Sequence, residues 1–270
     1  MNVLKTVAAA FSMYSAVPMP QFQWDSRNMR YVFLAFPLVG ALAGGLCWAW
    51  AWLCGYLLLP DLLRGAVLCL IPVLVTGGIH LDGYADTCDA LASRGSAEKK
   101  REILKDPHIG TFAVIRLCVH FVLTLALWTA LKPYPPVPVL LSFCLSRVQS
   151  GLAVVSFPLA GGTGLARTFA DAADKKTVRI LLIVLDVLLS AGLCFFGYGG
   201  IAMAAAAQAV FLYTFFMSKK QFGGFSGDLA GWFLVQAETW MLAALFAARM
   251  LEGCDFCNGT FVCGKTAFYL

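Results

Sequence analysis

Charged residues are scarce in this sequence, since Asp, Glu, Lys and Arg together make up only 13% of its 270 residues. A typical soluble domain has roughly a quarter of its residues charged and about half of them apolar. Here 60% of the residues are hydrophobic and the mean hydropathy is +0.77. The chain therefore has too few polar side chains to cover a soluble protein of this size, and its composition predicts an integral membrane protein.

The sequence also lacks internal repeats, low-complexity segments and a separate polar domain. We therefore expect one membrane-embedded domain over residues 1–251 and a short Cys-containing tail over residues 252–270. The first twenty residues, "MNVLKTVAAAFSMYSAVPMP", lack the small-x-small cleavage site of a secretory signal peptide. They predict instead a short helix at the membrane interface, closed by Pro18 and Pro20.

Long apolar runs are abundant. Seven segments are apolar over the roughly 17–25 residues that a helix needs to cross a bilayer. They are Tyr31–Leu59, Leu62–Ile79, Ile109–Leu131, Val137–Phe157, Val178–Phe196, Ile201–Met217 and Leu229–Met250. The first is long enough to be tilted, or to be broken at Gly44 and Gly45. The sequence thus predicts an all-α fold, a polytopic integral membrane helical bundle of about seven transmembrane helices plus a short N-terminal interfacial helix.

Lys and Arg residues gather on one side of these predicted spans. The larger group, on the side of the N-terminus, is Lys5, Arg27, Arg30, Arg94, Lys99, Lys100, Arg101, Lys105, Arg167, Lys175, Lys176, Arg179, Lys219 and Lys220. The other side has Arg64, Lys132, Arg249 and Lys265. The positive-inside rule places the larger group in the cytoplasm and the C-terminus outside. The net charge of +5 follows from this topology, so we expect the lipid bilayer, and no nucleic acid, as a partner.

Cysteines are concentrated in the tail, where "CDFCNGTFVC" contains Cys254, Cys257 and Cys263. A C-x-x-C pair with a third Cys is compatible with a metal site or with a disulfide. Structural zinc sites have four ligands, and no fourth ligand is evident here. We therefore favour a tail with a disulfide, and the role of these cysteines stays open.

Three aspartates, Asp82, Asp86 and Asp89, stand in "HLDGYADTCDA", directly after the second apolar run. If that span continues as a helix, the i, i+4, i+7 spacing places the three carboxylates on one face, where they repel one another. Clustered carboxylate oxygens suit Mg²⁺ or Mn²⁺. We therefore interpret the three aspartates as metal ligands and catalytic residues. The alternative is a solvated, acidic end of a helix.

A basic segment follows, "SAEKKREILKDPHIGTF", in which Arg101 and Lys105 stand four residues apart on a predicted helix that ends before Pro107. Basic side chains opposite a carboxylate–metal site suit a phosphate or diphosphate substrate. An ordinary cytoplasmic loop would be basic as well. Asp106 is predicted to be a helix cap or a further metal ligand.

A glycine-rich turn, "SKKQFGGFSGDLAGW", precedes the last span and contains Gly223, Gly224, Gly227 and Asp228. Such a turn before a helix presents free backbone N–H groups to anions, and Lys219 adds positive charge. The alternative is a plain tight turn.

Four charged residues fall inside predicted spans, namely Arg116, Arg147, Asp186 and Glu238. Because burying an ionisable group in a bilayer is costly, each is a functional candidate. We expect Arg147 to reach an anionic substrate and Glu238 to pair with another helix, whereas Asp186 has no predicted partner. Together the residues indicate a membrane enzyme with a cytoplasm-facing divalent-metal site that carries out phosphoryl-type transfer.

The motif "GGIHLDGYADTCDA" resembles the signature of the cobalamin synthase family, the adenosylcobinamide-GDP ribazoletransferases. Other segments resemble motifs of that family in the same order. They are "SAVPMP", "FPLVGALAGG", "REILKDPHIGTF", "LSR", "GLARTF" and "GGFSGDLAG". The chain departs from the family in its cysteine-containing tail. It also departs at Val235 and Gln236, where an acidic residue is frequent and only Glu238 matches.

The resemblance implies a Mg²⁺-dependent transferase of the bacterial inner membrane that acts late in cobalamin (vitamin B12) biosynthesis. It would transfer the adenosylcobinamide phosphate of adenosylcobinamide-GDP to α-ribazole or α-ribazole 5′-phosphate and release GMP, with other late-pathway enzymes as further partners. Asp82, Asp86 and Asp89 would hold Mg²⁺ or take the hydroxyl proton, with Asp228 as another metal ligand. The implied substrate-binding residues are His80, Arg101, Lys105, Asp106, Arg147, Lys219, Gly223, Gly224, Gly227 and Asp228.

Two other functions remain as alternatives. A CDP-alcohol phosphatidyltransferase performs related chemistry, but its signature has "DG-x-x-AR" and two further aspartates, where this chain has "DGYAD". A corrinoid or divalent-cation transporter would place its polar ligands near the bilayer midplane in broken helices. Here the motifs lie at the predicted membrane surface.

Overall fold

The computed structural model describes residues 3–20, 29–131, 135–160, 165–255 and 262–263. Within these ranges the regular secondary structure is helical apart from two strands of two residues each, and turns and short loops connect the helices. The helices are α1 (Val3–Tyr14), α3 (Val32–Tyr56), α4 (Asp61–Thr76), α5 (Ile79–Ala92), α6 (Ala97–Ile103), α7 (Thr111–Ala130), α8 (Pro136–Ser156), α9 (Leu165–Ala172), α10 (Lys175–Cys194), α11 (Gly197–Phe222) and α12 (Gly227–Gly253).

Six of these helices, α3, α7, α8, α10, α11 and α12, are long and apolar enough to cross a membrane, and the bent pair of α4 and α5 passes the same test as one unit. The outward faces of α7 and α10 are apolar, with side chains such as Val122 and Leu188 more than half exposed. Exposed apolar surface on this scale is unusual for a soluble monomer and fits contact with lipid. The prediction of an all-α, polytopic membrane bundle is confirmed.

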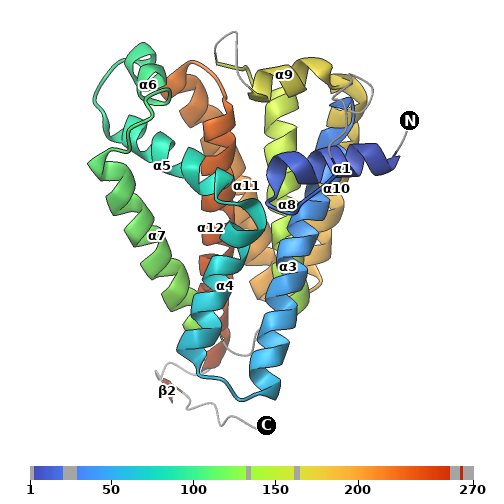
Figure 1. Ribbon diagram of the computed structural model, residues 1–270. Helices are drawn as coiled ribbons and strands as arrows, with labels where there is room; N and C mark the ends of the chain where they lie inside the picture. The colour runs from blue at the N-terminus through green and yellow to red at the C-terminus, as the bar shows by residue number, and fades with distance from the viewer. Residues whose placement is uncertain (1–2, 21–28, 132–134, 161–164, 256–261, 264–270) are drawn as a thin grey trace.

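The second predicted span does not continue as a straight helix. Helix α4 ends at Thr76, and Gly77 and Gly78 adopt φ angles of +64° and +83°. Glycine reaches such left-handed conformations without the steric cost of a β-carbon. As a result α5 is bent by 97° from α4 and runs across one end of the bundle (Figure 1). We therefore treat α4 as the spanning part and α5 as lying at the membrane surface.

The first span is not broken at its glycine pair either, because α3 is continuous from Val32 to Tyr56. Gly44 instead lies against α8, and a β-carbon there would come within 2.7 Å of the Cα atom of Leu140. Gly40, one turn earlier, faces the backbone of Phe143 in the same way. Small residues four positions apart let two membrane helices approach closely, so these glycines serve helix packing.

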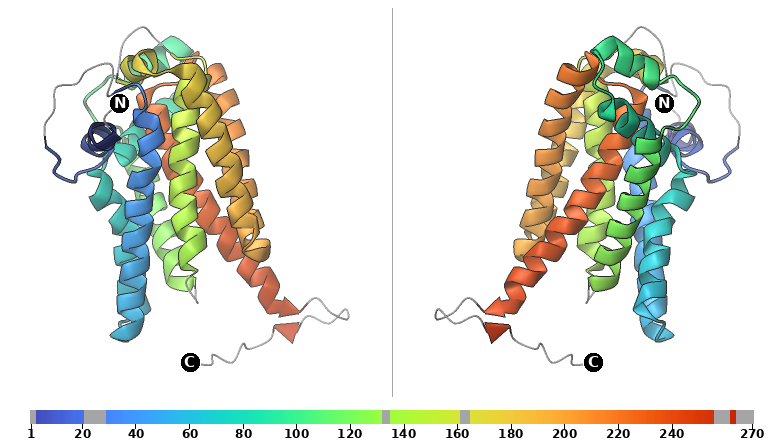
Figure 2. Two further views of the ribbon diagram at one scale, coloured as in Figure 1. Left: turned by 90° about the vertical axis from the view of Figure 1, so that its right-hand side faces the viewer. Right: turned by 90° about the vertical axis from the view of Figure 1, so that its left-hand side faces the viewer.

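The two ends of the bundle differ in charge. Helices α1, α6 and α9 lie at one end, with the basic residues that they and their flanking segments contain. The two short strands β1 (Cys254–Asp255) and β2 (Val262–Cys263) lie at the other end (Figures 1 and 2). Arg27 falls outside the described residues. At the opposite end the buried Arg64 donates hydrogen bonds to the carbonyl oxygens of Trp128 (3.0 Å) and Leu131 (3.4 Å). Arg64 therefore binds the C-terminal end of α7.

The predicted interfacial helix is α1, which lies crosswise against α3 (Figure 1). The segment after it is held at the end of α4, where the N–H of Ala16 donates to the carbonyl of Val75 at 2.8 Å. In the tail, β1 (Cys254–Asp255) pairs antiparallel with β2 (Val262–Cys263), and Cys254 lies opposite Cys263 in the register. Cys257 lies outside the described residues, and the role of the three cysteines stays open.

Candidate active site

A cavity of about 570 Å³ lies at the end of the bundle that carries α1, α6 and α9. One part of its lining is charged or polar, from Asp82, Arg101, Lys105, Arg167, Ser226 and Asp228. Another part is aromatic, from Tyr14, Phe33, Phe36, Phe169, Phe222 and Phe225. Its volume is in the range of about 300–1,000 Å³ that is usual for small-molecule sites. This cavity is the candidate active site.

The two aspartate motifs meet in this cavity because α5 and α12 cross closely. A β-carbon on Gly83 would come within 2.7 Å of the carbonyl oxygen of Asp228, and one on Gly231 within 2.9 Å of the carbonyl of His80. Only glycine fits at either position without a shift of the backbone. The crossing thus places Asp82 beside Asp228, although the two residues are far apart in the sequence.

The carboxylates at this crossing interact electrostatically. Partial burial, and then the charges of Asp82, Asp228 and Asp89, raise the pKa of the Asp86 carboxyl to about 6. Crowded like charges disfavour ionisation, and a divalent cation would offset that repulsion. The site therefore has an acidic cluster drawn from two helices rather than from α5 alone.

A preformed metal site is not present among the residues that the structure describes, since no three His, Cys, Asp or Glu side chains lie close enough to hold an ion. Mg²⁺ often binds one or two carboxylates and completes its shell with waters and substrate phosphates. Asp82 and Asp228, which line one cavity, offer the hard oxygen donors that such a site needs. The residues fit Mg²⁺ in that mode, and its binding remains a prediction.

Asp89 does not line the cavity. Its carboxylate lies directly against Gly110, the residue before the first turn of α7, where a β-carbon would overlap its oxygens. A negative charge is favourable beside the N-terminus of a helix. Asp89 is thus placed to hold α7 against α5 rather than to contact a ligand in the cavity.

The basic helix α6 docks on the C-terminal end of α11. Arg101 donates from Nη1 to the carbonyl of Phe222 at 2.7 Å and also pairs with Glu98 at 3.2 Å. Lys100 donates to the side chain of Gln221. These contacts hold α6 in place, so that Arg101 and the exposed Lys105 line the cavity. Their predicted role in substrate binding stays a prediction, and the geometry is consistent with it.

The glycine-rich turn divides into two parts. Gly223 and Gly224 have φ angles of +71° and +155° and lie outside the cavity lining, so they shape the turn. The turn is fixed to the end of α8, because the N–H of Phe225 donates to Pro158 at 2.7 Å. Gly227 and Asp228, in the first turn of α12, do line the cavity. Ser226 caps this helix start, because the N–H of Leu229 donates to its Oγ atom at 3.3 Å.

Two further predicted residues lie away from the cavity lining. Asp106 accepts a hydrogen bond from the backbone N–H of His108 at 3.0 Å and contacts its ring at 2.7 Å, which makes it part of a local turn. Lys219 is exposed on α11. The structure gives neither residue a contact with the acidic cluster.

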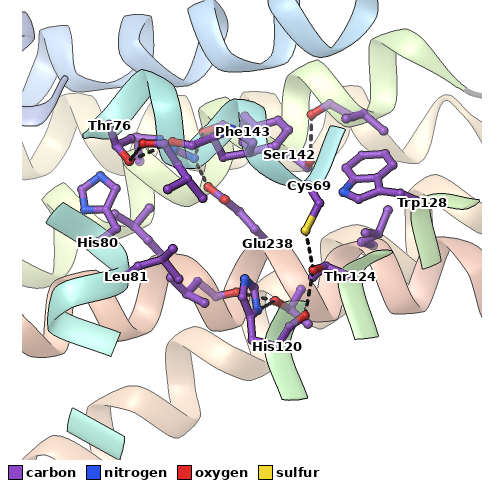
Figure 3. A pocket seen from close by; sticks show the side chains of 18 of the residues that line it. Cys69, Thr76, His80, Leu81, His120, Thr124, Trp128, Ser142, Phe143 and Glu238 are labelled. Atoms are coloured by element: carbon purple, nitrogen blue, oxygen red, sulfur yellow. Dashed lines mark hydrogen bonds and ion pairs between the residues drawn. The ribbon is translucent and has the colours of Figure 1, made fainter. Parts of the chain in front are cut away.

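A second, smaller cavity of about 70 Å³ lies deeper in the bundle, between α4, α7, α8 and α12. Figure 3 shows the Glu238 carboxylate in its middle, between His80 and Trp128. Glu238 forms an ion pair with Arg147, whose side chain is 1% exposed, and accepts a hydrogen bond from Ser146 at 3.1 Å. The prediction that Glu238 pairs with another helix is confirmed.

Arg147 is therefore placed differently from what its predicted contact with substrate would require. It lines the deeper cavity and not the one that contains Asp82 and Asp228. His80 lines both cavities, and its buried Nε2 atom has no hydrogen-bond partner among the described residues. His80 is thus placed where it can contact a ligand in the larger cavity, whereas the side chain of Arg147 is bound by Glu238.

Two polar contacts of the bundle interior were not predicted from the sequence. Thr239 on α12 contacts the Nδ1 atom of His120 on α7 at 3.2 Å. Asp186, for which the sequence predicts no partner, accepts hydrogen bonds from Gln208 at 3.0 and 3.3 Å and so links α10 to α11. Such contacts satisfy polar groups that a bilayer could not.

Arg167 lines the larger cavity, although the sequence does not predict it as a site residue. Arg167 lies on α9, lines the larger cavity and pairs through Nε with Asp171 at 2.9 Å. The segment "GLARTF" resembles a family motif, and that resemblance by itself assigns no role to Arg167. No local pattern indicates that α9 lies beside the cavity.

The chain is similar to proteins of one known family. The model of the cobalamin-5-phosphate synthase family matches residues 6–246. The chain is 40% identical to the adenosylcobinamide-GDP ribazoletransferase of Lachnoclostridium phytofermentans, over 94% of this chain and 96% of that protein. It is 33% identical to the adenosylcobinamide-GDP ribazoletransferase of Clostridium perfringens (strain ATCC 13124), over 87% of this chain and 94% of that protein. No solved structure matches the chain.

Proposed function

Because the chain belongs to the cobalamin-5-phosphate synthase family, we propose that it catalyses the ribazoletransferase step of cobalamin synthesis. It joins adenosylcobinamide-GDP to α-ribazole or α-ribazole 5′-phosphate and releases GMP. A ribazole hydroxyl oxygen forms a bond to the phosphorus next to the corrinoid, and the bond from that phosphorus to GMP breaks. The product is adenosylcobalamin or its 5′-phosphate.

The observation that carries this proposal is that carboxylates and cations line one cavity. Asp82 and Asp228 come from α5 and α12, Arg101 comes from α6, and Lys105 comes from the turn after α6. A diphosphate needs cationic partners that stabilise its charge during transfer. The guanidinium of Arg101 and the ammonium of Lys105 provide them, while the carboxylate cluster accepts the proton of the attacking hydroxyl.

Mg²⁺ is the proposed cofactor, and Asp82 and Asp228 are the residues that would hold it. Bound there, it would neutralise charge on the phosphate oxygens. The raised pKa of Asp86 supports a cation at this site, because a neighbouring cation stabilises the ionised form of a carboxyl that is crowded by other acids.

We also propose that this end of the bundle faces the cytoplasm of a bacterial cell membrane. The basic segments around α6 and α9 lie there (Figure 1), and the positive-inside rule places such segments in the cytoplasm. A cytoplasmic cavity would also open toward the compartment in which nucleotide substrates occur.

The test is to incubate membranes containing the protein with adenosylcobinamide-GDP and α-ribazole 5′-phosphate and to measure GMP. We expect GMP and the joined corrinoid to form in equal amounts. A matched control is Lys176→Gln, which removes an exposed charge outside the cavity lining. Reaction of a cytidine-linked lipid precursor in place of adenosylcobinamide-GDP would instead favour the phosphatidyltransferase alternative.

A further inference from the structure

The cations of the larger cavity lie on two separate walls. Arg101 is on α6 and Lys105 is in the turn just after it, whereas Arg167 is on α9. Figure 1 shows α6 and α9 on opposite sides of the same end of the bundle, and Figure 2 shows them at a similar height. The acidic residue Asp82 is on α5 and lines the same cavity.

One diphosphate does not explain this arrangement. Arg101 and Lys105 stand only four residues apart, at the end of α6 and just after it, and two cations suffice for a diphosphate that also meets a metal ion. A third cation on the opposite wall is placed for a second anionic group. The reaction proposed above has one such group available, the 5′-phosphate of the acceptor, which is a monoester with up to two negative charges.

The geometry of Arg167 suits a phosphate monoester. Asp171 takes the Nε–H of Arg167 at 2.9 Å and also pairs with Lys175 at 3.1 Å. A guanidinium has five N–H donors in a rigid fork, so this single bond orients the group without exhausting its donors. Arginine binds phosphate oxygens in a bidentate manner. At 43% exposure the side chain can still meet a ligand in the cavity.

The lining near α9 also suits the remainder of an aromatic nucleotide. Phe169 lies two residues after Arg167, and Phe33 and Phe36 of α3 line the same cavity. Aromatic side chains bind planar bases through their faces and edges. Ribazole is a benzimidazole nucleoside, so its base is apolar and planar.

We propose that Arg167 binds the 5′-phosphate of the acceptor, α-ribazole 5′-phosphate. The inference rests on the proposed function and adds the residue that distinguishes the two acceptors. Attack by a ribazole hydroxyl then occurs beside Asp82, with the donor diphosphate held on the α6 side and the acceptor phosphate on the α9 side.

The test compares the steady-state kinetics of both acceptors for the wild-type protein and for Arg167→Gln. Loss of a charge-assisted phosphate contact typically costs on the order of 10- to 100-fold in affinity. We expect a rise of that size in KM for α-ribazole 5′-phosphate, and less than about a threefold change in KM for α-ribazole and for adenosylcobinamide-GDP. Arg167→Lys should retain part of the preference, and Lys176→Gln all of it.

Other outcomes have distinct meanings. An equal rise in KM for both acceptors, or a rise for adenosylcobinamide-GDP alone, would overturn the role of Arg167 while GMP release still supports the proposed function. If the wild-type protein released GMP with neither acceptor, the proposed function itself would fail. A wild-type protein that used both acceptors equally well would also contradict the inference.

Discussion

Gly83 lies directly against the backbone of Asp228, so that a β-carbon on Gly83 would come within 2.7 Å of the Asp228 carbonyl oxygen. This contact joins the two motifs on which the site depends. It allows α5 to cross α12 closely enough for Asp82 and Asp228 to line one cavity. The acidic site is therefore a consequence of helix packing as much as of the aspartates themselves.

Gly83→Ala should separate α5 from α12 and lower turnover at least about tenfold, since overpacking of this kind displaces backbone at a cost of about 1–3 kcal/mol. GMP release and thermal unfolding in detergent measure the two effects. The matched control is Gly45→Ala on α3, where an added β-carbon meets nothing within 4 Å. Equal activity of the Gly83→Ala and wild-type proteins would show that the close crossing is not needed.

The raised pKa of Asp86 predicts a pH dependence of stability for the metal-free protein. A carboxyl with a pKa of about 6 in the folded state and a lower value when unfolded stabilises the fold only while protonated. Its contribution is therefore complete below about pH 4, the ordinary range of Asp, and is lost as the pH rises through 6. Thermal unfolding in EDTA should show this decline, and added Mg²⁺ should reduce it.

Asp86→Asn should flatten that decline, because the amide does not titrate. Asp171→Asn is the control, since Lys175 and then Arg167 lower the pKa of the Asp171 carboxyl and its contribution runs in the opposite direction. If Asp86→Asn and the wild-type protein lost stability in parallel between pH 4 and 7, the crowding of carboxylates around Asp86 would be disproved.

The ion pair between Arg147 and Glu238 predicts a large effect of breaking it. Leaving a buried charge without its partner typically costs about 3–5 kcal/mol, whereas replacing both partners by apolar residues can be nearly neutral. Glu238→Leu should therefore destabilise the protein strongly, and Arg147→Met combined with Glu238→Leu should restore much of the stability. Thermal unfolding of the wild-type protein, of Glu238→Leu, of Arg147→Met and of the double variant measures this effect in a double-mutant cycle.

The same double variant tests the contact with substrate that the sequence predicts for Arg147. Because Arg147 lines the deeper cavity, the stable double variant should keep its KM for adenosylcobinamide-GDP within about threefold, whereas the loss of a charged contact would raise it on the order of tenfold or more. A larger rise in KM in a double variant of normal stability would show that Arg147 contacts the substrate.

The proposed orientation predicts which side of the membrane is accessible at α6. Lys99 is exposed, whereas its neighbour Lys100 is buried against α11. The Lys99→Cys variant should react with an impermeant thiol reagent more than the wild-type protein does in inverted vesicles. In intact cells the two proteins should react equally. Labelling in intact cells alone would reverse the orientation.

The sequence predicted the helical segments well because each must cover about the thickness of a bilayer with apolar residues, and that requirement is local. The aspartates and the basic helix were identifiable for the same reason, as charges are costly in such a chain. The bend at Gly77 and Gly78 could not be distinguished from a straight span, since glycine permits both conformations. Nor could local patterns show that α5 crosses α12.

Placement of residues from distant segments was the least predictable feature. Arg167 reaches the cavity, and Arg147 lies away from it, because of how α8 and α9 pack against the other helices. Gly223 and Gly224 resembled an anion-binding loop, but their positive φ angles serve a turn that is bonded to the end of α8. Such relationships depend on interhelical contacts, which periodicity within one helix does not report.

The most direct test of the account is Mg²⁺-dependent release of GMP from adenosylcobinamide-GDP and α-ribazole 5′-phosphate by the wild-type, Asp82→Asn and Asp228→Asn proteins. We predict turnover that is abolished by excess EDTA, restored by Mg²⁺, and lowered on the order of 10²- to 10⁴-fold in each variant, while each variant still inserts into the membrane. Turnover that is undiminished in EDTA, or retained when both aspartates are replaced, would contradict the claim that these two carboxylates form one metal-dependent site.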